Sequence, residues 1–149
     1  QTTILPINIL EEENGLSRKT YLGQWVSCSQ MVNKKYQQEN IVYDFKIDSN
    51  NKDDFGYVFS GYVSIDNPGM YQFRTTSDDG SRLFIGSELI VDNDGLHGKK
   101  SVTGAIKLKK NRYRLVVEYF ERGGQESLEV DWKGPGFEWG AIPSYKLFH

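Results

Sequence analysis

The chain has 149 residues, about the length of one domain and enough to bury a core without disulfide bonds. Its formal net charge of −2 excludes the strongly basic surface on which duplex nucleic acid binds. No apolar run approaches the roughly 20 residues of a membrane span. One cysteine, Cys28, cannot form an internal disulfide, and two histidines do not make a zinc site of the usual kind. We therefore expect neither nucleic-acid binding nor membrane insertion.

The residue types predict an all-β domain. Alanine occurs only twice, whereas Val, Ile and Thr contribute 26 residues and Phe, Tyr and Trp contribute 8, 9 and 3. Helices favour alanine and unbranched side chains, and strands favour β-branched and aromatic ones. The 15 glycines and 4 prolines provide many turn positions.

The first 40 residues carry a weak pattern. An acidic run and Gly15 indicate that residues 1–15 are a linker or lead-in segment, so we expect the domain to occupy residues 16–149. Residues 16–40 are expected to be mostly loop, and the alternation over residues 41–47 predicts a strand. Because the sequence begins with Gln1 in place of an initiating methionine, we expect a mature form or an excised piece.

The strongest periodicity begins at Phe55, where apolar residues alternate over twelve positions and predict a long half-buried strand. The turn Asn67-Pro68-Gly69 and the alternation over residues 71–76 predict the return strand of a hairpin. Short strands at even spacing predict an antiparallel β-sandwich or barrel with little helix. These further strands are residues 82–85, 88–91, 102–108, 113–120 and 128–133.

Two loops carry candidate ligands for a cation. In the first, Asp78 and Asp79 end a strand, and calcium takes six to eight oxygen ligands. Neighbouring strand residues point to opposite faces, so both acids reach one ion only if the backbone kinks. The second loop, residues 121–126, contains two acids, an amide and two glycines. The alternatives are a solvated turn for the first loop and an ordinary flexible loop for the second.

Other chemistry-bearing residues have structural interpretations. Residues 92–98 resemble the start of a calcium loop, but Thr103 occupies the place of the required glutamate, so a polar turn is expected instead. Arg82 is expected to form an ion pair and His97 a hydrogen bond within its loop. Among tryptophans that sugars could stack on, Trp25, Trp132 and Trp139, we expect Trp132 to be packed and Trp139 to be exposed in a glycine-rich loop.

The sequence resembles the PA-14 domain family, named from anthrax protective antigen, over roughly residues 15–148. The resemblance rests on several motifs, of which the run from Asp78 to Leu83 is the most specific. They are Phe59-Ser60-Gly61-Tyr62, Asn67-Pro68-Gly69-Met70-Tyr71-Gln72-Phe73, Ser77-Asp78-Asp79-Gly80-Ser81-Arg82-Leu83-Phe84-Ile85, Val91-Asp92-Asn93-Asp94-Gly95, Val117-Glu118-Tyr119-Phe120-Glu121 and Pro143-Ser144-Tyr145-Lys146-Leu147-Phe148.

That resemblance implies a β-sandwich module and a calcium site. In lectin members of the family, two adjacent aspartates joined by a cis peptide bind calcium, and the calcium binds sugar hydroxyls. Asp78 and Asp79 match this pair. The asparagine of the second calcium loop falls on Glu121, and the two ligating carbonyls fall on Gly123 and Gln125. Glutamate in place of asparagine keeps an oxygen ligand but adds length and charge, which departs from the family pattern.

The resemblance also implies a function. Residues 134–136 and 143–148 look most like copies attached to glycoside hydrolases of Bacteroidetes-type bacteria. We expect a non-catalytic accessory domain of a secreted, periplasmic or cell-surface enzyme, with a glycan or oligosaccharide and the adjoining catalytic domain as partners. The alternative is a structural spacer or docking module without a ligand. Catalysis is not expected, because Asp78 and Asp79 are chain neighbours, poorly placed to flank a glycosidic bond.

Overall fold

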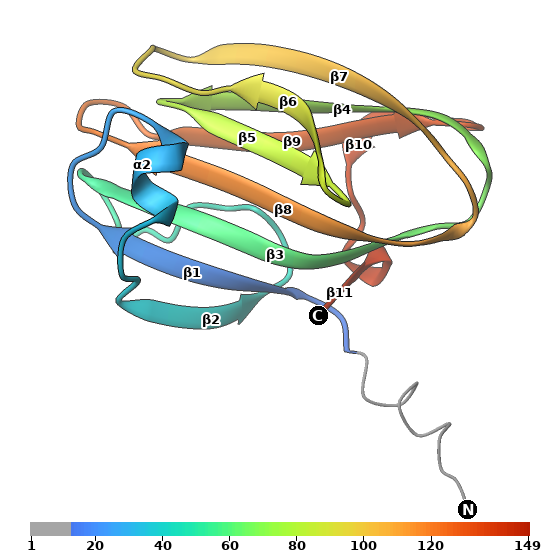
Figure 1. The fold of residues 1–149 in the computed structure, drawn as a ribbon, viewed down its shortest axis with the longest axis horizontal. Coiled ribbons are helices and arrows are strands. Elements are labelled where there is room, and N and C mark those ends of the chain that lie inside the picture. Colours follow the sequence, from blue (N-terminus) through green and yellow to red (C-terminus); the bar gives the residue numbers. More distant parts are fainter. Residues whose placement is uncertain (1–12) are drawn as a thin grey trace, which may run out of the picture.

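The computed structural model describes residues 13–149 and shows two antiparallel sheets facing each other (Figure 1). The expected lead-in segment lies mostly in residues 1–12, outside the described residues. Within the described residues, two short helices accompany the strands, α2 (Cys28–Val32) and the 3-10 helix η2 (Ser144–Lys146). The strands are β1 (Leu16–Leu22), β2 (Gln38–Val42), β3 (Phe55–Ile65), β4 (Gly69–Asp78), β5 (Ser81–Ile85), β6 (Glu88–Asn93), β7 (Lys100–Leu108), β8 (Asn111–Glu121), β9 (Ser127–Gly134), β10 (Phe137–Ala141) and β11 (Leu147–Phe148).

The sheets have seven and four strands. The larger has the order β2-β1-β3-β8-β5-β6, with β11 also pairing with β3, and the smaller has the order β10-β9-β4-β7. Every strand pair among the described residues is antiparallel. The expected all-β antiparallel sandwich is confirmed.

The core lies between the two sheets and follows the predicted alternation of β3. Phe55, Tyr57 and Phe59 are fully buried on its inner face. They belong to one cluster with Phe73 of β4 and Trp132 of β9, from the opposite sheet. Burying each of these aromatic side chains contributes about 1.5–3 kcal/mol. Trp132 is packed, as expected.

The chain crosses repeatedly between the sheets, which makes the predicted hairpin at residues 67–69 wrong. β3 pairs with β1, β8 and β11, whereas β4 pairs with β7 and β9. The turn therefore carries the chain from one sheet to the other. A tight turn between two alternating segments indicates a reversal of direction, but it does not specify which sheet receives the second strand.

Two predictions for the N-terminal third are also wrong. Residues 16–40 contain β1, α2 and most of β2, and the strand expected at residues 41–47 ends at Val42. The inner face of β1 carries polar residues: Arg18 is buried over the ring of Tyr57, with its guanidinium carbon 4.5 Å from the ring centroid. This arginine interrupts the apolar pattern, and β2 is an edge strand with mostly exposed residues.

A second, smaller core lies under α2. It contains Trp25, Cys28, Met31 and Phe120 together with Tyr21. Cys28 is fully buried, and burial raises the pKa of its thiol. This core holds α2 against the end of β8, the end of the sandwich drawn at the left in Figure 1. Among residues 13–149 no helix has the length and apolar character to span a membrane.

Candidate metal centre

Three segments that connect strands meet at the end of the sandwich next to α2 (Figure 1). The strand register brings them together, because Phe55 at the start of β3 lies opposite Glu121 at the end of β8. On the other sheet, Asp78 at the end of β4 lies opposite Ser127 at the start of β9. The segments are residues 51–54, 79–80 and 122–126, so the polar loops of the sequence are neighbours in space.

The Asp78-Asp79 segment is fixed against β8. The hydroxyl of Tyr119 donates to the carbonyl of Asp78 at 2.7 Å. Backbone hydrogen bonds join the Asp79 N–H to the Phe120 carbonyl at 3.2 Å and the Phe120 N–H to the Gly80 carbonyl at 3.0 Å. The peptide bond between the two aspartates is cis. Oxygens of Asp78, Asp79 and Glu121 lie within 4.8 Å of one another.

Glycine is required at position 80 because the neighbouring loop approaches closely. A Cβ there would lie 2.7 Å from the backbone nitrogen of Gly95 and 2.7 Å from a ring carbon of Phe120. The approach allows the N–H of His97 to donate to Asp79 Oδ1 at 3.2 Å. The N–H of Arg122 donates to Asp79 Oδ2 at 2.9 Å, so both oxygens of this carboxylate are oriented.

The structural roles expected for the surrounding residues are confirmed. The two ring nitrogens of His97 lie 2.8 Å from the Asn93 carbonyl and 2.7 Å from the Gly98 carbonyl. Residues 92–98 form a polar turn in which Asp94 Oδ1 accepts from the N–H groups of Cys28 and Gly95, both at 2.8 Å. Arg82 forms the expected ion pair, with its partner being Glu118.

Glu121 is the most buried acid of the group. Its side chain is 1% exposed, and its Oε2 accepts from the N–H of Gly123 at 2.9 Å. Its Oε1 is buried and has no hydrogen-bond partner among the described residues. Burial and the neighbouring carboxyl groups, Asp79 above all and also Asp53, raise the pKa of Glu121 to about 8. Burial and the charge of Asp79 also raise the pKa of Asp78.

Basic side chains do not neutralise this cluster. Within residues 13–149, no Lys or Arg nitrogen forms an ion pair with Asp78, Asp79 or Glu121. The nearby Arg82 is committed to Glu118, with its Nη2 2.6 Å from the carboxylate. Calcium binds oxygens at 2.3–2.6 Å, so ligands around one ion can be up to about 5 Å apart. The three carboxyl groups and the unpartnered Oε1 fit such an ion.

Of the remaining predicted ligands, Gly123 and Gln125 lie in the loop after Glu121, whereas Trp139 lies on β10. Gly123, whose φ of 95° favours glycine, places its N–H on Glu121, and Gln125 is exposed in the same loop. Trp139 lies in β10, so the expected loop is wrong, but it is half-buried and more exposed than the buried Trp25 and Trp132, as predicted. The Arg74 guanidinium covers its ring at 4.2 Å. Arg74 precedes Asp78 by four residues on the same face of β4, about 13 Å away at 3.3 Å per residue.

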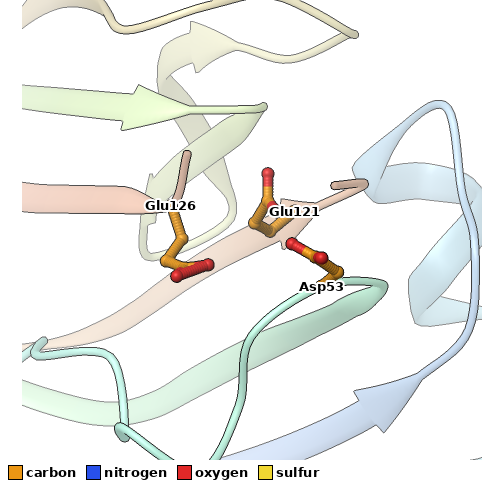
Figure 2. Close-up of side chains that lie close together, drawn as sticks. All are labelled: Asp53, Glu121 and Glu126. Atoms are coloured by element: carbon orange, nitrogen blue, oxygen red, sulfur yellow. The ribbon is translucent and has the colours of Figure 1, made fainter. Parts of the chain in front are cut away.

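Two further acids lie beside Glu121: Glu126, which belongs to the candidate loop of residues 121–126, and Asp53, which the sequence did not predict. Oxygens of Asp53, Glu121 and Glu126 also lie within 4.8 Å of one another, and Figure 2 shows the Asp53 and Glu126 side chains directed toward each other beside Glu121. Asp53 belongs to a polar loop with no motif. The signal that could have revealed it is its position two residues before a strand that pairs with β8.

A hollow of about 290 Å³ lies at the opposite end of the sandwich, beyond the end of β3. Four of its twelve lining residues are aromatic: Tyr71, Trp132, Phe137 and the exposed Tyr145. The hollow is therefore separate from the carboxylate cluster by the length of the sheet.

Comparisons with known proteins agree with this architecture. A family model described as the PA14 domain matches residues 12–139. Anti-sigma-I factor RsgI3 of Acetivibrio thermocellus is 34% identical over 80 residues, which cover 52% of this chain but only 12% of that protein.

Two solved structures share the fold at low sequence identity. A PA14 sugar-binding domain from an RTX adhesin has a TM-score of 0.77 and 17% identity, with 91% of this chain and 98% of that chain covered. The epithelial adhesin 6 A domain from Candida glabrata, solved in complex with Galβ1-3GlcNAc, has a TM-score of 0.71 and 11% identity, with 91% and 87% covered.

Proposed function

The chain belongs to the PA14 domain family, and we propose that it is a non-catalytic carbohydrate-binding module whose glycan site is built on calcium held by Asp78, Asp79 and Glu121. The observation that carries this proposal is the buried, unpartnered Oε1 of Glu121 inside a cluster of three carboxyl groups. A buried carboxylate without a partner is costly, and a divalent cation compensates it directly.

The residues of the chain have distinct parts in this site. Asp78, Asp79 and Glu121 supply carboxylate oxygens, and the carbonyls of Gly123 and Gln125 complete the proposed ligand set. The backbone N–H groups that hold both oxygens of Asp79 orient it before any ligand binds. When bound, calcium offers its open coordination positions to sugar hydroxyls, as oxygen-rich calcium sites admit exogenous oxygens.

Trp139 would contact only a longer glycan. The outer face of β4 leads from Asp78 past Thr76 to Arg74, on which the Trp139 ring stacks. The separation of about 13 Å, at 3.3 Å per residue, exceeds a single sugar ring. We therefore place Trp139 at a second contact for an oligosaccharide.

The same geometry supports a binding role in place of catalysis. Glycosidases hold two carboxyl groups on opposite sides of the scissile bond, 5–5.5 Å apart in retaining enzymes. Asp78, Asp79 and Glu121 instead converge on one point. An adhesin neighbour that binds sugar is consistent with a secreted, periplasmic or cell-surface location. We propose that the domain belongs to a glycoside hydrolase; the relative RsgI3 supports a second parent, an anti-sigma factor.

A glycan array tests this function. The chain should bind glycans in millimolar calcium, lose the signal in chelator, and lose it in Asp78→Asn, whose side chain accepts no hydrogen bond within the described residues. Glu88→Gln, an exposed charge change on the β5–β6 hairpin, is the matched control. Absence of any glycan signal, with calcium present and the fold intact, would favour the alternative of a structural spacer or docking module.

A further inference from the structure

We propose that a second divalent cation binds beside the first, between Asp53, Glu121 and Glu126, with Glu121 shared by the two ions. This deepens the proposed function, because it rests on the calcium site described above, but it does not require glycan binding. The PA-14 resemblance includes neither Asp53 nor Glu126 in a site.

The three acids reach this position from separate parts of the chain. Asp53 comes from the loop before β3, Glu121 from the end of β8, and Glu126 from the residue before β9. Figure 2 shows the Asp53 and Glu126 carboxyl groups converging beside Glu121. One oxygen of each lies within 4.8 Å of the others, a spacing that suits ligands around one calcium ion.

The five carboxyl groups define two positions for a cation. Asp78 and Asp79 form a group with Glu121, and Asp53 and Glu126 form another group with Glu121. The five do not form a single group within that distance, so one ion cannot contact all of them in this arrangement. A carboxylate has two oxygens and can serve two ions at once.

Glu121 provides the observation that separates this cluster from ordinary surface acids. The residue is 1% exposed, its Oε1 has no partner within residues 13–149, and the carboxyl groups near it, Asp79 and Asp53, are themselves acceptors when ionised. An ion held by Asp78, Asp79 and Glu121 leaves the oxygens of Asp53 and Glu126, which lie within 4.8 Å of Glu121, without a cation.

The combined charge of the five carboxyl groups also favours two ions. Five ionised carboxyl groups carry −5, so one divalent ion leaves −3 and a second leaves −1. Among the described residues, none of the five forms an ion pair with Lys or Arg within 4.0 Å. Mutual repulsion therefore remains strong with one ion and is nearly removed with two.

The ligand chemistry selects a hard cation. All three side chains offer oxygen only, and Asp53 and Glu126 are exposed, which leaves room for water ligands. Calcium accepts such irregular, loop-borne oxygen ligands more readily than magnesium, which demands a tighter octahedron.

Native mass spectrometry and calorimetric titration of the chain with calcium test the proposal. We expect two ions per chain, and one ion in the Asp53→Asn/Glu126→Gln variant, whose altered side chains are exposed and leave the core untouched. The matched control Glu39→Gln/Glu88→Gln removes two exposed charges elsewhere and should retain two ions. Asp78→Asn should lower the affinity of one ion at least tenfold and leave the other.

The outcomes separate this inference from the function on which it rests. One ion in the unmodified chain, bound equally by the Asp53→Asn/Glu126→Gln variant, would overturn the second site and leave the first intact. No bound calcium at all would overturn both. Two ions that persist in the double variant would also overturn the assignment, because the second ion would then lie elsewhere.

Discussion

Replacing Glu121 by glutamine should change stability in opposite directions without and with calcium. In the calcium-free protein, the pKa of Glu121 is raised from 4.5 to about 8, mainly by burial and the neighbouring Asp79. The folded state therefore binds this proton more tightly than the unfolded chain does. The ionised carboxylate opposes folding; the cost is absent below pH 4.5 and grows until pH 8.

The size of the effect follows from that shift. Each pKa unit corresponds to about 1.4 kcal/mol, so at pH 7, where Glu121 must take up a proton on folding, the shift costs up to about 3 kcal/mol. Glutamine removes the charge, keeps an oxygen for the Gly123 N–H and presents an amide donor to Asp79 and Asp53. In chelator at pH 7, Glu121→Gln should raise the melting temperature by several degrees, at about 2–4 °C per kcal/mol for a chain of this size.

With calcium, the unmodified chain should be more stable than Glu121→Gln. Binding to the folded state alone adds about 2.7 kcal/mol at a hundredfold excess over Kd, and Glu121→Gln weakens that binding. Calorimetric melts at pH 5 and pH 7, in chelator and in calcium, measure all four combinations, with Glu88→Gln as control. In chelator at pH 7, a Glu121→Gln protein that melts below the unmodified chain would contradict the expected effect of the raised pKa. A rise in melting temperature at pH 5 as large as the rise at pH 7 would also contradict it.

Four further outcomes follow from the same contacts. Millimolar calcium should raise the melting temperature of the unmodified chain by about 5–10 °C, with magnesium doing less; an unchanged melt in calcium and chelator would contradict this. Gly80→Ala should cost about 1–3 kcal/mol in urea unfolding because its Cβ meets backbone at 2.7 Å, and an unaffected midpoint would show that the loop yields. Arg82→Ala should cost about 3–5 kcal/mol by leaving Glu118 buried and unpaired, whereas a loss below 1 kcal/mol would place Glu118 in water. Trp139→Ala should weaken oligosaccharide binding but leave monosaccharide binding unchanged, and Tyr145→Ala, in the distant hollow, should change neither; the reverse pattern would move the site to that hollow.

The sandwich was predictable where side chains alternate on a sheet with one buried face. β3 follows its pattern because its inner residues are all apolar or glycine. β1 does not, since Arg18 and Thr20 occupy inward positions, with the arginine covering Tyr57. The sequence also could not predict which sheet β4 joins, because a tight turn has the same sequence signature within a sheet and between sheets.

The candidate site was predictable in part. Asp78, Asp79 and Glu121 were expected from the family resemblance, and the structure brings their oxygens together. Asp53 was missed because it lies in a loop without a motif, 68 positions before Glu121, and only strand register brings the two together. Trp139 was placed in a loop because glycines flank it, whereas β9 pairs with that segment as an additional strand.

A calorimetric titration with the glycan that binds best on the array shows whether calcium holds the sugar. It should be run on the same protein in millimolar calcium and again in chelator, with Asp78→Asn alongside. We expect one glycan site per chain in calcium and no detectable binding in chelator or in Asp78→Asn. Equal affinity in calcium and chelator would contradict this, because the glycan would then be held without the carboxylate cluster.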